Sequence, residues 1–308
     1  MIQLRELPHE TLRAQLAGPG LNLRTGPFVN RVRSPLPDVV QGLRLVYGDY
    51  TVSDPDDYAD FHVALTCPSR LRRWIHPQAQ FYFDGFPPFK PLPLAQAFPM
   101  LEWGLNWCVG NHCHQYLILH AAVLEKHGRA LILPGAPGAG KSTLCAGLVY
   151  QGGWRLLSDE LTLLRPGDGY VQPLPRPLSL KNASIEVIRA FAPGVVITPP
   201  ARDTSKGTVA HVRPPTTSVL RDRELVLPSW VVFPRYQNGA PTRLERFPRG
   251  QAYLRLGEQA FNYSLIGPSG FETLSRLMDT CESYTFEYSR LEEALPLFDG
   301  LTPTEMPA

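Results

Sequence analysis

A glycine-rich octapeptide near the middle of the chain has the residue types that bind a phosphate. Residues 135–142, Gly-Ala-Pro-Gly-Ala-Gly-Lys-Ser, match G-x-x-x-x-G-K-[ST] at every fixed position. Glycine lets successive backbone N–H groups turn inward, and a helix that begins at Lys141 adds its partly positive N-terminal end. Lys141 can reach the β- and γ-phosphates of a nucleotide, and the Ser142 hydroxyl can bind Mg²⁺. The residues expected to bind a nucleotide, ATP or GTP, are Gly135, Ala136, Pro137, Gly138, Ala139, Gly140, Lys141, Ser142 and Thr143.

The alternative interpretation of this segment is a glycine-rich turn that binds nothing. The context argues against it, because the apolar run 131–134 precedes the loop and a helix-forming run follows it. Thr143 has the weakest claim of the set and is most simply a helix residue. We therefore expect a phosphate site here.

An acidic pair, Asp159-Glu160, follows eighteen residues after Lys141. We expect it to end a strand that lies parallel to the strand before the loop, so that its side chains reach the same edge of the sheet. One carboxylate can bind Mg²⁺ together with Ser142, and one can take a proton from an attacking hydroxyl. The alternative is an exposed, solvated strand end.

Several elements must position these groups. Residues 117–135 read as two strands joined at Gly128, which can take the positive φ of a tight hairpin. A helix follows the loop. A second, amphipathic helix is predicted over 94–117, with Pro99 inside it. Short β-type runs are predicted at 42–52, 60–67, 79–85 and 229–236, and a helix followed by a short strand is predicted at 270–289.

The segment "LHAAVLEKHGRALILPGAPGAGKSTLCAGLVYQGGWRLLSDE" resembles the core of bacterial HPr kinase/phosphorylase, a relative of phosphoenolpyruvate carboxykinases. A His-containing strand, a hairpin, a P-loop, one helix and an acidic pair follow in the same order. The similarity is greatest to the HPr-kinase-related kinases and is closest over residues 94–215. It implies an α/β fold with a P-loop core of that type and a mixed sheet, preceded by a small β-rich N-terminal region.

The resemblance also implies roles for single residues. Asp159 matches the acidic residue that acts as base, and His120 matches a histidine that faces the phosphate-transfer site. Two positions depart from the bacterial enzyme, which has Asp where this chain has Glu160 and Glu where it has Thr143. The docking signature for the protein HPr is not recognisable, so neither HPr as substrate nor the reverse phosphorylase reaction follows.

Further cations follow in the next hundred residues. Positive charge near a transferring phosphoryl group lowers the barrier, and Lys206-Gly207 fits a lid that closes over the nucleotide. The candidates are Lys181 and Lys206 first, then Arg176, His211 and Arg213. Each can equally be an ordinary solvated cation, and His120 can equally be a core histidine. Cys108, His112, Cys113 and His114 fit no standard zinc spacing.

Composition limits the function classes. The formal net charge of +2 does not favour a nucleic-acid binder. Five irregularly spaced cysteines form no disulfide framework, and neither a signal peptide nor a membrane span is visible. We expect a cytoplasmic protein with a β-rich N-terminal region at 1–92 and a P-loop domain at 93–308. The sequence leaves open whether the protein forms a homo-oligomer.

Together these patterns predict a kinase that transfers the γ-phosphoryl group of ATP to a hydroxyl acceptor. Asp159, His120, Lys141 and Lys206 are its expected catalytic residues, and Ser142, Asp159 and Glu160 its Mg²⁺ ligands. By resemblance the acceptor is a serine of a protein or peptide; a small hydroxyl compound is an alternative. A regulatory nucleotide-binding module would have the same loop. A carboxykinase-like enzyme would need a second metal site and an arginine-rich pocket, neither of which is evident.

Overall fold

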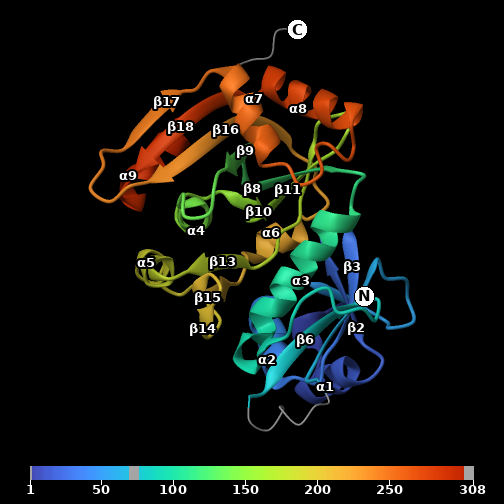
Figure 1. The fold of residues 1–308 in the computed structure, drawn as a ribbon. Coiled ribbons are helices and arrows are strands. Elements are labelled where there is room, and N and C mark those ends of the chain that lie inside the picture. The colour runs from blue at the N-terminus through green and yellow to red at the C-terminus, as the bar shows by residue number, and fades with distance from the viewer. Residues whose placement is uncertain (1, 69–75, 302–308) are drawn as a thin grey trace.

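The computed structural model describes residues 2–68 and 76–301, which form a mixed α/β structure with three sheets. Both expected regions, 1–92 and 93–308, include residues outside this description. Figure 1 shows the N-terminal strands in a sheet at one end of the molecule, a larger sheet at the other, and a small sheet beside them. Among the described residues, no helix has the length and apolar character needed to cross a bilayer.

The N-terminal sheet has the strand order β1-β4-β2-β3-β5-β6-β7, in which only the neighbours β3 and β5 are parallel. Its strands are β1 (Ile2–Gln3), β2 (Leu21–Thr25), β3 (Phe28–Arg33), β4 (Thr51–Ser53), β5 (Phe61–Thr66), β6 (Gln78–Phe83) and β7 (Leu92–Pro93). They share one apolar core with α1 (His9–Ala17), α2 (Pro37–Val46) and α3 (Ala97–His112). Single 3₁₀ turns lie at η1 (Leu4–Glu6) and η3 (Leu94–Gln96). The strands predicted at 60–67 and 79–85 and the helix predicted around Pro99 are confirmed.

The prediction of β-structure over 42–52 is wrong in its first half. Residues 42–46 are the end of α2, and only Thr51–Ser53 pairs as a strand. Gly42 lies directly against α3, since a Cβ built there would be 2.1 Å from the Phe98 ring. The buried apolar residues of α2 recur at helical spacing: Val39, Val40, Leu43 and Val46. Packing against α3 therefore decides the conformation of this apolar run.

The central sheet is mixed, as the resemblance implies. Its order is β12-β11-β8-β9-β16-β18-β17, and β10 pairs with β8 beside β11. Its strands are β8 (Leu117–Lys126), β9 (Arg129–Pro134), β10 (Arg155–Ser158), β11 (Leu161–Leu164), β12 (Val171–Gln172), β16 (Leu227–Tyr236), β17 (Arg243–Arg246) and β18 (Glu282–Tyr288). The neighbours β9, β16 and β18 are parallel. The predicted hairpin, the strand predicted at 229–236, and the helix followed by a short strand predicted over 270–289 are confirmed.

Helices cover both faces of the central sheet (Figure 1). Alternate residues of β8 show the two faces, because Ala122 and Leu124 belong to one apolar cluster and Ala121 and Val123 to the other. The first cluster contains α4 (Lys141–Tyr150) and α9 (Leu291–Asp299), and the second contains α7 (Arg249–Glu258) and α8 (Pro268–Thr280). The sheet edge between these layers is where the glycine-rich loop lies.

A small antiparallel sheet packs under α4. Its strands are β13 (Leu178–Lys181), β14 (Ala201–Thr204) and β15 (Gly207–Val212), with α5 (Ala183–Phe191) after β13 and α6 (Thr216–Leu220) after β15. Leu178 and Leu180 enter the core beneath α4. Ser179 and His211 are paired across β13 and β15, and His211 contacts Phe98 of α3 edge-on. This sheet therefore joins the central sheet to the N-terminal core.

Candidate active site

The glycine-rich loop runs from the end of β9 to the first residue of α4. Gly138 and Gly140 have φ values of +88° and +86°, which other residues rarely adopt. No side chain caps the N-terminus of α4, so its first backbone N–H groups are available to an anion. Because Ala136, Pro137 and Gly138 are exposed, the loop is accessible from solvent.

Two tyrosines fix the loop to the parallel strands. The backbone N–H of Tyr236 donates to the Ala139 carbonyl at 3.1 Å, and the Tyr288 hydroxyl donates to the Gly140 carbonyl at 2.8 Å. Lys141 Nζ donates to the Gly135 carbonyl across the base of the loop. Burial lowers the pKa of Lys141, although nearby carboxylates oppose the shift. The loop is thus held in a curled form with its lysine folded inward.

The acidic pair lies level with the start of this loop. The sequence predicted that this pair ends a strand. The pair lies instead in the break between β10 and β11, which both pair with β8. The flanking pairs are Ser158 with Val123 and Leu161 with His120, and Ala121 on the same stretch of β8 pairs with the last residue of β9. The strand β10 runs in the same direction as β9, but β8 lies between them. Asp159 and Glu160 therefore reach the predicted edge of the sheet, although β9 and β10 do not pair directly.

Asp159 is a buried carboxyl with one unused oxygen. Its Oδ2 accepts a hydrogen bond of 3.0 Å from the backbone N–H of Ser179, and Oδ1 has no partner at hydrogen-bond distance among the described residues. Burial raises the pKa of Asp159 to about 6; Glu160 adds to the shift, and Ser179, Ser142 and Lys181 reduce it. A carboxyl with a pKa near neutrality can accept a proton from a hydroxyl during catalysis.

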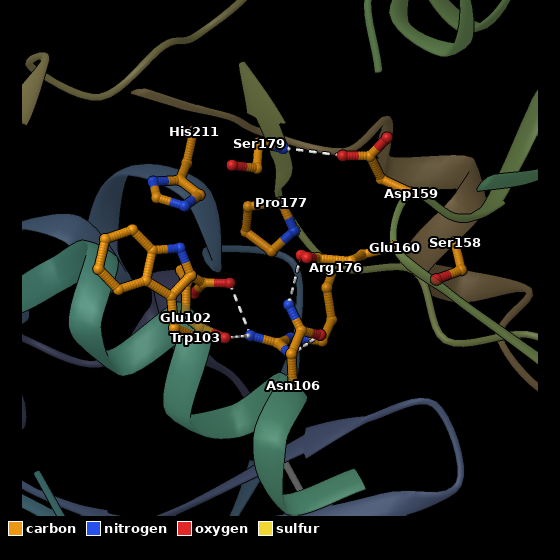
Figure 2. A pocket seen from close by; sticks show the side chains of 10 residues that line it. All are labelled: Glu102, Trp103, Asn106, Ser158, Asp159, Glu160, Arg176, Pro177, Ser179 and His211. Carbon is orange, nitrogen blue, oxygen red and sulfur yellow. Dashed lines mark hydrogen bonds and ion pairs between the residues drawn. The ribbon is translucent and has the colours of Figure 1, made fainter. Parts of the chain in front are cut away.

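Glu160 points away from Asp159, toward α3. Its Oε2 accepts from Asn106 Nδ2 at 2.9 Å, and Asn106 Oδ1 accepts from Arg176 Nη1 at 2.6 Å (Figure 2). Arg176 also pairs with the buried carboxylate of Glu102 at 2.6 Å, and Tyr47 donates to the same carboxylate. A chain of polar contacts thus links the N-terminal core to the acidic pair.

These residues line a cavity of about 10 Å³ beside Asp159. The Ser179 hydroxyl and both ring nitrogens of His211 are buried there without a partner among the described residues. A cavity of this size holds about one water molecule, which can hydrogen-bond to such groups. The cavity is too small for a substrate, so it is part of the frame behind the carboxylates.

His120 lies in β8 at the same level as the acidic pair and is half-buried. Burial lowers its pKa to about 4, and the charges of Lys141, Lys181 and Lys206 lower it further against the opposing charge of Glu160. Its ring also lies near Phe261, with 5.8 Å between centroids. His120 is therefore a neutral imidazole at pH 7, close to three lysines and a carboxylate.

The two lysines favoured by sequence do reach this region. Lys181 ends β13 and Lys206 lies in the turn between β14 and β15. Their charges act on both His120 and Lys141, and Lys206 Nζ sits 5.7 Å from the centre of the Trp103 ring in α3. The small sheet therefore brings positive charge to the loop, as a phosphoryl-transfer site needs.

The other three candidate cations are not free to bind phosphate. Arg176 is 6 % exposed and engaged by Glu102 and Asn106. Arg213 pairs with Asp49 at 2.8 Å. Burial lowers the pKa of His211 to about 3, so that it is uncharged. The structure therefore argues against these three residues as cations that contact the transferring phosphoryl group.

The oxygens beside the loop fit Mg²⁺. Ser142 lies close enough to lower the pKa of Asp159, whose Oδ1 is unpaired, and both residues offer the hard oxygen ligands that this ion prefers. No group of three or more His, Cys, Asp or Glu residues in the described chain could hold a metal alone. That finding is compatible with Mg²⁺, which commonly uses one or two protein ligands plus substrate phosphates.

The cysteines and the histidine that pack at the C-terminal end of α3 and just after it are structural. Cys108 and Cys113 are buried, and burial raises the pKa of each thiol to about 12. His112 stacks on Phe83 with 4.7 Å between ring centroids. Neutral thiols in an apolar core are poor ligands for zinc.

Sequence reasoning missed Glu102, Asn106, Trp103 and Ser179, which frame the acidic pair in Figure 2. No motif contains them. The one available signal was a glutamate inside an otherwise apolar helix, because a carboxylate at such a position requires a buried partner.

Comparisons with known proteins add little. No family model matches the sequence, and no curated protein matches it. One solved structure that matches is titled "Structure of the Hpr(Ser) kinase/phosphatase from Coxiella burnetii". The two sequences are 14% identical, and the match covers 59% of this chain and 90% of that chain. The TM-score is 0.26, which establishes neither a common fold nor a common activity. The functional argument therefore depends on the chain's own residues.

Proposed function

We propose that the protein is a phosphotransferase that moves the γ-phosphoryl group of Mg²⁺-bound ATP to a hydroxyl group. One observation carries the proposal: a buried carboxyl, Asp159, lies beside the phosphate loop with an unpaired oxygen and a pKa of about 6. A loop that only bound nucleotide could use this carboxylate to hold Mg²⁺, but it would gain nothing from a pKa raised toward neutrality. The cost of burying Asp159 is explained if it handles a proton.

The residues divide the reaction between them. Asp159 Oδ1 takes the proton of the acceptor hydroxyl while the hydroxyl oxygen bonds to the γ-phosphorus. The bond from that phosphorus to the β–γ bridging oxygen then breaks, and ADP leaves with the electron pair. Backbone N–H groups at the start of α4 and the ammonium of Lys141 stabilise the negative charge. His120, which is neutral, can donate a hydrogen bond without adding charge.

Mg²⁺ would neutralise charge on the phosphate oxygens, held by Ser142 and by a carboxylate of Asp159 or Glu160. The Glu160 carboxylate is turned toward Asn106 and α3, so it would reach the ion only after leaving that contact. Lys181 and Lys206 add positive charge from the small sheet. The acceptor that we propose is a serine of a protein or peptide, as the sequence resemblance implies; a small hydroxyl compound is the alternative.

The test is incubation with γ-labelled ATP, Mg²⁺ and host lysate. We expect ADP to form in proportion to one labelled product. Asp159→Asn should reduce this transfer at least about a hundredfold, the lower end for a lost general base, while the affinity for ATP measured without Mg²⁺ stays within about twofold. Asp279→Asn, an equivalent change at an exposed position of α8, is the matched control.

Two results would contradict the proposal. Label transfer by Asp159→Asn at the wild-type rate would remove Asp159 as the base. ADP formation without any phosphorylated product would favour the regulatory nucleotide-binding module instead.

A further inference from the structure

A second and larger hollow opens on the other side of the loop. This cleft of about 550 Å³ is bordered by Gly135, Ala136 and Ala139 of the loop itself. Its walls come from the ends of β16 and β18, from β17 and from the end of α7. A volume between about 300 and 1,000 Å³ is typical of sites for small organic ligands. The cleft is therefore large enough for a ligand that also touches the loop.

The cleft lies where the topology favours a ligand. The parallel strands β9, β16 and β18 all end at this edge of the sheet. The chain leaves β9 into α4 on one face, but between β16 and β18 it passes through α7 and α8 on the opposite face (Figure 1). Ligands of open α/β sheets bind at the carboxyl ends of strands where the connections change face.

Six charged side chains line this cleft: Arg235, Arg243, Arg255, Glu245, Glu258 and Glu287. Glu287 is opposite Arg235 in the pairing with β16 and opposite Arg243 in the pairing with β17. Even so, none of the six forms an ion pair within 4.0 Å with another residue of the described chain. Arg255 stacks on Phe247 at 4.6 Å, and Phe233 supplies an apolar surface. Donors, acceptors and an apolar wall are thus all available.

We propose that this cleft binds the nucleoside part of the nucleotide. The inference rests on the proposed function and extends it. Asp159, Glu160 and His120 lie on the β8 side of the loop, so the γ-phosphate must point that way. The nucleoside then points to the β16 side. Neighbouring strands are about 4.8 Å apart, so the ends of β16 and β18 lie within about 10 Å of the loop, which is within reach of a nucleoside attached to bound phosphates.

The chemistry of the lining fits a nucleoside better than a phosphate. A site for further phosphate groups would not carry three glutamates, because they repel anions. Carboxylates of Glu258 and Glu287 accept hydrogen bonds from ribose hydroxyls, and the fork of Arg243 donates to base or ribose oxygens. The cleft therefore recognises a ligand that is polar but uncharged at this end.

The experiment compares two ligands that share the phosphate chain. Affinities for Mg²⁺-ATP and for Mg²⁺-tripolyphosphate are measured by calorimetry on wild type, Arg243→Ala and Glu258→Gln. We expect each variant to weaken ATP binding about tenfold, as the loss of one charge-assisted hydrogen bond would, and to leave tripolyphosphate affinity within about twofold. Arg246→Ala is the matched control, because Arg246 pairs with Glu282 on the other face of the same strand. It should change neither affinity.

The outcomes separate the two proposals. Unchanged ATP affinity in both cleft variants, or an equal loss for ATP and tripolyphosphate, would overturn the nucleoside cleft while leaving the loop as a phosphate site. If wild type bound neither ligand, the proposed function would be wrong and the inference would fail with it. Arg243 and Glu258 are exposed, so neither substitution should unfold the protein, and the melting temperature of each variant checks this.

Discussion

Asp159 has an energetic cost that depends on pH. Because burial raises its pKa from 3.8 to about 6, the folded chain binds this proton more tightly than the unfolded chain. Folding therefore takes up a proton between about pH 4 and pH 6. Over that window the contribution of Asp159 to the free energy of unfolding falls as the pH rises, and the loss is complete above pH 6.

We therefore expect Asp159→Asn to be more stable than wild type at neutral pH. The Asn carbonyl can still accept from the Ser179 N–H, and no buried charge remains. The gain approaches about 3 kcal/mol, which is equivalent to a rise in pKa from 3.8 to about 6. Urea unfolding at pH 7.5 and at pH 4 measures it, with Asp279→Asn as control. A difference in stability that does not shrink toward pH 4 would contradict the raised pKa.

Gly140 is the loop residue that tolerates a side chain least. Its φ is +86°, and a Cβ there would lie 2.4 Å from the Tyr288 hydroxyl oxygen that fixes the loop. Gly138 has almost the same φ but nothing within 4 Å of such a Cβ. The two glycines therefore separate backbone strain from steric displacement.

We expect Gly138→Ala to cost about 1 kcal/mol, the strain of the left-handed region alone. Gly140→Ala should cost at least about 1 kcal/mol more, because Tyr288 must move and its hydrogen bond to the loop is lost. Urea unfolding of both variants measures the difference. Equal losses would show that the tyrosine does not constrain the loop.

The sequence predicted the phosphate loop and Asp159 because their chemistry depends on residues close together in the chain. The spacing from Lys141 to Asp159 reflects one helix between two strands of the same direction. The contacts among Glu102, Asn106 and Arg176 could not be found in this way. They join residues 70 or more positions apart, and only the packing of α3 brings them together.

At the scale of elements, local signals were sufficient where turn chemistry or periodicity was strong. In the hairpin between β8 and β9, His127 and Gly128 both have positive φ, as a type I′ turn requires. The apolar period of α3 was visible despite Pro99, which lies in the first turn, where proline removes no helical hydrogen bond. Such elements need no tertiary information.

Other elements depend on their neighbours. No helix or strand was predicted between residues 174 and 228, yet β13, α5, β14, β15 and α6 form there. The frequent prolines of this segment are typical of loops. In the structure they fall between the helices and strands and not within them, at Pro193, Pro199, Pro200, Pro214 and Pro215. These short strands become stable only as a sheet packed under α4. Sequence patterns in isolation therefore underestimate them.

The molecule as a whole is tied together by buried polar contacts between distant segments. Tyr50 donates to the Pro175 carbonyl at 2.7 Å, and Asp49 accepts from Arg213 at 2.8 Å. Arg176 pairs with Glu102, and Glu102 also accepts from Tyr47. Apart from the hydrogen bond between Tyr47 and Glu102, which lies within the N-terminal core, each contact joins that core to the segment that carries the small sheet. The N-terminal core is thus connected to the acidic pair through Asn106.

Breaking the central ion pair tests this connection. Arg176→Gln leaves the Glu102 carboxylate buried without its cation, and burial already raises the pKa of Glu102. Losing one partner of a buried pair costs about 3–5 kcal/mol, whereas replacing both partners costs far less. We therefore expect Arg176→Gln to be strongly destabilised and Glu102→Gln/Arg176→Gln to recover most of the loss. Urea unfolding of the wild type, both single variants and the double variant forms a complete cycle. If the double variant lost the sum of the two single losses, the charges would act independently, and this pair would not connect the N-terminal core to the segment that carries the small sheet.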